Sequence, residues 1–208
     1  MNHISNDIIA LALKPFGFTP DDRFCDRVRT YMDLLLRWNQ KTSLTTVTDP
    51  AEILRLHFGE SVLAAATVPI RHGRLADVGS GAGFPAVPIR MVSEGLSVIL
   101  IESNQKKATF LAEIVRELYL DHVDVRRCRM GEVDLGEEKV DFATARALGI
   151  DDRFLNWSRD ALNDEGSVVL WLGESDSGRI SKKPGWKWSD AIRIPQSERR
   201  VILRGVRI

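Results

Sequence analysis

The sequence predicts an α/β fold in which a mostly parallel, doubly wound (Rossmann-like) sheet follows an N-terminal helical extension. From about residue 74 onward, short aliphatic runs alternate with helix-forming or turn-forming segments, as in parallel sheets with crossover helices. Before that point, helix-start signals precede apolar residues spaced three and four apart. We therefore expect a helical region over residues 1–70 and a ligand-binding α/β domain over residues 71–208.

Length and composition are those of an ordinary globular protein. The chain has 208 residues, of which 44% are hydrophobic and 28% charged, and its formal net charge is zero. No apolar run approaches the roughly 18 residues that span a bilayer, and the N-terminus lacks a signal-peptide pattern. We expect a cytoplasmic protein without membrane contact. Local basic patches can still bind phosphates despite the zero net charge.

The cysteines and histidines give little support for a disulfide or a metal site. Cys25 and Cys128 lie far apart in the sequence and form no CxxC pair. The histidines are scattered, so we expect no metal and assign each histidine to a surface or packing position: His3, His57, His72 and His122.

Two helix starts organise the N-terminal region. Thr19-Pro20-Asp21-Asp22 predicts a helix with Thr19 as the N-cap, proline in the first turn and acids at the positive end of the helix dipole. Asp49-Pro50-Ala51-Glu52 predicts a second helix that begins with a capping box. The apolar stripe of the first helix consists of Phe24, Val28, Tyr31, Leu35 and Trp38.

Six aliphatic runs predict the strands of the sheet. Asn104 is expected to cap a crossover helix between the second and third runs, with an apolar face between Phe110 and Leu118. The last run ends the sequence, and we expect it to join the sheet. The runs are RLADVG from residue 74, LSVILIES from 96, HVDVRRC from 122, KVDFATA from 139, GSVVLWLG from 166 and RRVILRGVRI from 199.

A glycine-rich loop, LADVGSGAGFPAVPI over residues 75–89, follows the first run and precedes a helix expected near Pro85 to Pro88. Ligands bind at the carboxyl ends of such strands. The dinucleotide fingerprint requires glycine or alanine where this chain has Phe84, and no Gly-Lys-Ser/Thr follows as in a P-loop. Both observations disfavour a pyrophosphate or triphosphate ligand.

The pattern D-x-G-x-G-x-G instead favours the cofactor loop of an S-adenosylmethionine-dependent methyltransferase. It consists of Asp77, Gly79, Gly81 and Gly83, and glycine lets the backbone adopt positive φ and approach a ligand closely. Glu102 ends the second run, where an acid can accept hydrogen bonds from ribose hydroxyls. The alternative is a generic tight turn with an incidental surface glutamate.

Several motifs together resemble one family, the small-subunit ribosomal RNA guanine-N7 methyltransferases, also called the glucose-inhibited division protein B family. The motifs are LLLRWNQKTSLTTVTDPAEILRLHFGES, DVGSGAGFP, IESNQKKATFL, CRMGE and ATARAL, in that order along the chain. The resemblance implies a Rossmann-like class I methyltransferase fold with an N-terminal helical region. It also implies methyl transfer from S-adenosylmethionine to N7 of a guanine in small-subunit (16S) ribosomal RNA.

The resemblance implies site residues position by position. Beyond the loop, the cofactor site would include Phe84, Glu102, Met130, Gly131 and Arg146. The candidates for contacting RNA or shaping the acceptor site are Arg146, Lys106, Arg129 and Asn39. Simpler alternatives exist: surface or helix-end charges for Lys106 and Arg129, a helix C-cap for Asn39, and for Arg146 an ion pair with an acid such as Asp77 or Asp141.

The chain departs from the family pattern at a few positions. Ala86 replaces a usual glycine, Gly131 replaces a usual acid with Glu132 one place later, and Glu60 stands where aspartate is usual. The segment after Leu172 also diverges from the family pattern.

Guanine N7 carries an in-plane lone pair and no proton, so this chemistry requires no general base and depends on positioning. Zero net charge favours an assembled small ribosomal subunit over naked RNA as the partner, and we expect a monomer. Two other functions remain open: a small-molecule methyltransferase with a helical lid, and a cofactor-binding module without turnover.

Overall fold

The computed structural model describes residues 4–135, 139–146 and 152–208. In its N-terminal part, the helices begin at capping residues. Asp21 caps the long helix α2 (Asp22–Asn39) by accepting a hydrogen bond from the Phe24 amide at 2.7 Å. The expected N-cap at Thr19 is therefore wrong by two residues, because a carboxylate is a stronger acceptor than a hydroxyl at the positive end of a helix. Asp49 caps the next helix as predicted, accepting from the Glu52 amide at 2.9 Å.

A π-helix interrupts the second helical segment of this region. Its wide turn places Gly59 directly against Phe16, where a Cβ atom would overlap the phenylalanine ring. The π-helix η2 (Ile53–Gly59) joins two α-helical pieces, and such turns are rare and are often found at functional sites. The other elements here are α1 (Asn6–Leu13), the 3₁₀ turn η1 (Lys14–Phe16), α3 (Pro50–Glu52) and α4 (Glu60–Thr67).

The α/β part is built on one sheet with strand order β3-β2-β1-β4-β5-β8-β6, and β7 also pairs with β8. The strands from β3 to β5 are parallel to one another, whereas β8 runs antiparallel to β5. The expected mostly parallel α/β fold is confirmed, and each of the six aliphatic runs forms a strand. The strands are β1 (His72–Val78), β2 (Gly95–Ile101), β3 (Val123–Arg126), β4 (Val140–Arg146), β5 (Leu162–Gly173), β6 (Trp186–Trp188), β7 (Ile192–Arg193) and β8 (Arg200–Arg207).

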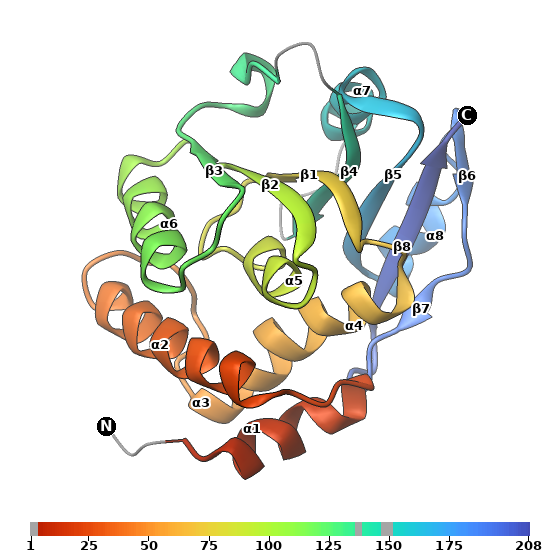
Figure 1. Cartoon of the computed structure of the whole chain (residues 1–208). Coiled ribbons are helices and arrows are strands. Elements are labelled where there is room, and N and C mark those ends of the chain that lie inside the picture. Colours follow the sequence, from red (N-terminus) through yellow and green to blue (C-terminus); the bar gives the residue numbers. More distant parts are fainter. Residues whose placement is uncertain (1–3, 136–138, 147–151) are drawn as a thin grey trace.

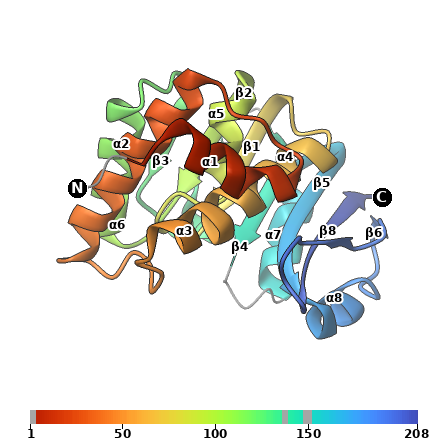
Figure 2. The same cartoon turned by 90° about the horizontal axis from the view of Figure 1, so that it is seen from below.

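Helices cover both faces of the sheet (Figure 1). Alternate strand residues enter two separate apolar clusters; for example, Leu75 packs with the N-terminal helices, whereas Ala76 packs on the opposite face. On the first face α5 (Ala86–Val92) and α6 (Gln105–Glu117) lie next to α2 and α4. On the second face lie α7 (Asp152–Ala161) and α8 (Glu174–Ile180), as a second view also shows (Figure 2).

The strand order creates a switch point beside β1. This strand pairs with β2 on one side and with β4 on the other, so the chain leaves their carboxyl ends in opposite directions. Asn104 caps α6 as predicted, by accepting from the Lys107 amide at 3.2 Å, and α5 begins where the loop motif predicted a helix. No helix among the described residues is long and apolar enough to cross a membrane.

Candidate cofactor and acceptor site

The glycine loop connects β1 to α5 at this switch point. Gly79, Gly81 and Gly83 have φ angles of 69°, 55° and 88°, a region that side-chain-bearing residues rarely adopt. The amides of Gly79 and Ser80 both donate to the Ile101 carbonyl, at 2.8 and 3.1 Å. The loop is therefore fixed across the end of β2, with its backbone at the edge where ligands bind in such sheets.

Glu102 holds the loop and the start of α6 together. One carboxylate oxygen accepts from the Gly81 amide at 2.9 Å, and the other accepts from the Asn104 amide at 2.8 Å. The residue is only 8% exposed. Each carboxylate oxygen has a second lone pair, so Glu102 can accept further hydrogen bonds from ligand hydroxyls.

Asp77 lies beneath the loop, at 1% exposure. Its Oδ1 accepts a hydrogen bond from the Thr144 hydroxyl at 2.6 Å, which joins β1 to β4. Burial raises the pKa of Asp77 to about 7, against the lowering effect of its hydrogen bonds. The side chain thus supports the strand ends under the loop.

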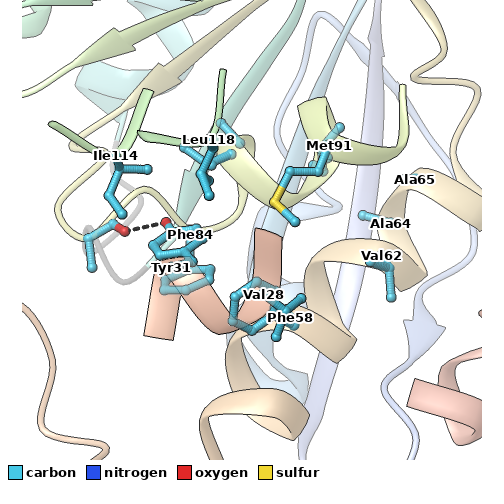
Figure 3. Close-up of a cluster of buried hydrophobic side chains, with 14 of the residues drawn as sticks. Val28, Tyr31, Phe58, Val62, Ala64, Ala65, Phe84, Met91, Ile114 and Leu118 are labelled. Carbon is cyan, nitrogen blue, oxygen red and sulfur yellow. Dashed lines mark hydrogen bonds between the residues drawn. The ribbon is translucent and has the colours of Figure 1, made fainter. Parts of the chain in front are cut away.

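Phe84 ends the loop within a stack of aromatic rings. Tyr31 lies parallel to it, with ring centroids 4.9 Å apart, and His57 also stacks on it at 4.6 Å. The Tyr31 hydroxyl donates to the Ala82 carbonyl at 2.5 Å, and Figure 3 shows this bond beside the stacked rings. A Cβ atom on Gly83 would overlap that hydroxyl, so glycine is required there for space as well as for φ.

His57 is a packing residue, as the sequence predicts, but both of its ring nitrogens also have polar neighbours. Nε2 lies 2.9 Å from the Thr45 hydroxyl, and Nδ1 lies 3.3 Å from Nη2 of Arg146. Arginine can only donate, so Nδ1 accepts and the ring proton belongs on Nε2. Burial, together with Arg146 and Arg200, lowers the pKa of His57 to about 3. The imidazole is therefore neutral at physiological pH.

Arg146 ends β4 and points into the helical region. Its Nη2 donates to the Leu56 carbonyl at 2.7 Å and lies 3.3 Å from Oε2 of Glu60. Glu60 is 1% exposed, and its other oxygen is 2.7 Å from Nη1 of Arg200 on β8. Burial lowers the pKa of Arg146 to about 10. The ion-pair partner that the structure shows is Glu60, in place of the Asp77 or Asp141 considered from the sequence.

Asn39, the last residue of α2, holds the loop that follows the helix. Its Oδ1 accepts from the amides of Leu44 and Thr45, at 2.8 and 3.1 Å, and its Nδ2 donates to the Thr45 carbonyl at 2.8 Å. Because Thr45 contacts His57, a continuous series of contacts joins Asn39 to Arg146. The sequence placed these two residues in one site, and the structure connects them through a histidine.

The remaining predicted residues follow β2 and β3. Lys106 is exposed in the first turn of α6, and Arg129 is exposed immediately before the 3₁₀ turn η3 (Met130–Glu132). Open space surrounds the position where Gly131 would carry a Cβ atom. The Glu132 carboxylate accepts from the Arg129 amide at 3.1 Å, so it caps its own turn.

The structure shows where two departures from the family pattern lie. Ala86 is fully buried at the start of α5, where its methyl group belongs to the main apolar cluster. The divergent segment after Leu172 forms α8 and β6, and the Trp188 ring packs closely over Gly205 of β8. The end of the ATARAL motif, including Ala147, lies outside the described residues, as does His3.

Sequence reasoning did not select Tyr31, His57, Glu60 or Arg200 as site residues. The sequence indicates only an apolar stripe for Tyr31 and only a packing role for His57. A signal was present in the run FGESVLAAA, where a single acid stands among apolar residues. A buried acid needs a cationic partner, but the sequence does not reveal which arginine supplies it.

Comparison with known proteins identifies the family. The family model for rRNA small subunit methyltransferase G, GidB, matches residues 25–189. The ribosomal RNA small subunit methyltransferase G of Syntrophotalea carbinolica is 32% identical over 174 residues, which cover 82% of this chain and 79% of that protein. The protein of the same name from Xylella fastidiosa is 36% identical over 74% of this chain and 71% of its own length.

Solved structures show the same fold at low identity. A SAM-dependent methyltransferase from Aquifex aeolicus superposes with a TM-score of 0.65 at 19% identity, over 80% of this chain and 97% of that one. TYW2 of M. jannaschii, in complex with AdoMet, gives a TM-score of 0.56 at 19% identity, over 73% of this chain and 76% of its own. The family resemblance is thereby confirmed: the chain has a class I methyltransferase fold and belongs to the rRNA small subunit methyltransferase G (GidB) family.

Proposed function

We propose that the protein transfers a methyl group from S-adenosylmethionine to N7 of a guanine in small-subunit (16S) ribosomal RNA. Family membership supports the reaction and the substrate class. The structural observation that carries the proposal is the bond from the Gly81 amide to Glu102, at 2.9 Å, at the carboxyl edge of the sheet. This bond holds a glycine loop and an acid with spare acceptor capacity side by side.

The residues of this edge fit S-adenosylmethionine. The cofactor supplies an electrophilic methyl group when bound. Glu102 keeps acceptor capacity that would serve ribose hydroxyls, and the positive-φ glycines carry no side chain that would keep a ligand from the loop backbone. The proposed cofactor-binding residues are Asp77, Gly79, Gly81, Gly83, Phe84, Glu102, Met130, Gly131 and Arg146.

The acceptor side is proposed to position guanine without a general base. N7 bears no proton, and His57, with a pKa of about 3, is a poor proton acceptor at neutral pH. Arg146, Lys106, Arg129 and Asn39 are the proposed acceptor-site residues. Lys106 and Arg129 are exposed after neighbouring strands, where they can meet RNA phosphates.

We further propose a monomeric cytoplasmic enzyme that acts on the assembled small subunit. The test uses labelled S-adenosylmethionine and small ribosomal subunits that lack N7 methylation, with matched naked RNA in parallel. Mass spectrometry then maps the label, and we expect a single labelled guanine N7 with wild-type protein. Absence of label at guanine N7 would sink the proposal. Cofactor binding without transfer to either substrate would indicate a binding module, and label on small molecules alone would indicate a small-molecule enzyme.

A further inference from the structure

Among the described residues, Nη2 makes the polar contacts that the structure shows for the Arg146 guanidinium. Nη2 contacts the Leu56 carbonyl, His57 Nδ1 and the Glu60 carboxylate, at 2.7, 3.3 and 3.3 Å. Nη1 is buried and has no hydrogen-bond partner among the described residues. Burying a charged N–H group without a hydrogen-bond acceptor costs free energy. A ligand atom that accepted a hydrogen bond from Nη1 would therefore bind more tightly.

The helical region supplies the groups that contact this guanidinium. In the π-helix η2 hydrogen bonds run from i to i+5, and the Leu56 carbonyl within it faces Arg146 instead of serving only the helix. Glu60 follows directly as the first residue of α4. These groups and the arginine therefore come from segments separated by about ninety residues, and the contacts of Leu56, His57 and Glu60 join them.

Glu60 is the only acid that the structure shows paired to both Arg146 and Arg200, within the described part of the chain. The side chain of Arg200 is 34% exposed and can turn towards water, whereas that of Arg146 is 11% exposed. Removal of the Glu60 charge would leave two neighbouring cations, and the buried one would have to shift.

We infer that Glu60 is a positioning residue. It holds the Arg146 guanidinium so that Nη1 can donate a hydrogen bond to an acceptor atom of a bound substrate, and Arg200 links β8 to the same carboxylate. The inference rests on the proposed function, because it assigns the acceptor atom to a bound substrate. Glu60 itself does not touch the reacting atoms. It acts by holding the buried guanidinium with Nη1 free, and this explains why an acid is tolerated at 1% exposure in an apolar helix.

The kinetic test compares Glu60→Gln with Glu60→Asp, using small ribosomal subunits as substrate. We expect E60Q to lower kcat at least tenfold, and E60D to keep activity within about threefold of wild type because it retains the charge. Arg146→Lys completes a double-mutant cycle. Adding E60Q to R146K should lower kcat by less than a further twofold, because the group that Glu60 positions is already altered. Arg204→Gln is the matched control, because Arg204 also lies on β8 and bonds Ser167 at 2.9 Å; its kcat should equal that of wild type.

A second measurement does not depend on turnover. Side-chain NMR of ¹⁵N-labelled arginine reports rotation of the guanidinium, which should be slow for Arg146 in wild type and E60D but fast in E60Q. Unchanged Arg146 signals in a folded E60Q protein would overturn the inference, as would independent, multiplicative effects of E60Q and R146K. If wild type methylates no ribosomal substrate, the proposed function fails, while the NMR comparison still decides whether Glu60 positions Arg146.

Discussion

Tyr31 and Phe84 lie face to face, with ring centroids 4.9 Å apart and planes only 5° from parallel. One ring comes from helix α2 and the other from the glycine loop. Because the Tyr31 hydroxyl also bonds the Ala82 carbonyl at 2.5 Å, the helical region helps to hold the loop in its conformation. The N-terminal helices thus support the glycine loop of the proposed cofactor site.

The first prediction concerns this hydroxyl. Tyr31→Phe keeps the stack but leaves the buried Ala82 carbonyl without its donor, so we expect a loss of about 1–3 kcal/mol in the free energy of unfolding. Affinity for S-adenosylmethionine should fall severalfold, as measured by calorimetric titration. Tyr119→Phe is the control, because that side chain is 85% exposed and should change neither quantity. Equal behaviour of the two variants would contradict a structural role for the Tyr31 hydroxyl.

The second prediction concerns Gly83. Gly83→Ala places a methyl group on a residue with φ of 88° and against the Tyr31 hydroxyl, so we expect destabilisation of at least about 2 kcal/mol. Urea unfolding measures the change. Gly178→Ala has the same chemistry in helix α8 with open space around the new methyl group, and should stabilise by up to about 1 kcal/mol. A G83A protein as stable as wild type would refute the described loop geometry.

The third prediction concerns Glu102. Glu102→Gln removes a charged acceptor for the Gly81 amide and for ribose hydroxyls, so cofactor affinity should fall about ten- to a hundredfold, which corresponds to about 1.5–3 kcal/mol. Calorimetric titration with S-adenosylmethionine and its demethylated product tests this. Glu117→Gln removes an exposed acid paired with Arg116 and should leave affinity unchanged. Undiminished affinity in E102Q would exclude Glu102 from the cofactor site.

The fourth prediction is a pH dependence. His57 has a pKa of about 3 in the folded protein against 6.5 for the free side chain, so the unfolded state binds the extra proton between these values. The contribution of His57 to the free energy of unfolding should therefore be constant above pH 6.5 and fall as the pH drops below it, by about 2 kcal/mol between pH 7 and pH 5. Asp77, with a pKa of about 7, contributes an opposite slope in wild type and variants alike, so the slope due to His57 is the difference between wild type and variant. His57→Gln should lose this slope in urea unfolding, whereas His72→Gln, at an exposed position, should keep it. The same slope in wild type and H57Q would assign it to other groups.

Local signals account for the parts of the fold that the sequence predicts well. The caps at Asp49 and Asn104 and the six strands follow from residue type and period, which act over a few neighbouring positions. The loop was recognisable because its glycines and Glu102 occupy fixed offsets from strand ends. The error at Thr19 arose where two capping residues compete within one turn, and propensity alone does not rank them.

Long-range pairing is what the sequence does not reveal. The partner of Arg146 is a glutamate from another segment, held in place by a π-helix that has no simple sequence signature. The sequence suggests an acid such as Asp77 or Asp141 as the partner of Arg146, whereas the structure pairs it with Glu60. Only packing of the helical region against β4 decides between them.

The π-helix also makes this segment sensitive to chain length. Residues Ile53–Gly59 take a wider turn than an α-helix, so the loss of one residue would let the segment wind regularly. In a regular α-helix the Leu56 carbonyl would bond the amide four residues later and turn from Arg146 towards the helix axis. Single-residue deletions here should therefore be tolerated far less well than substitutions that keep the spacing. The length of this turn, as much as its composition, is under constraint.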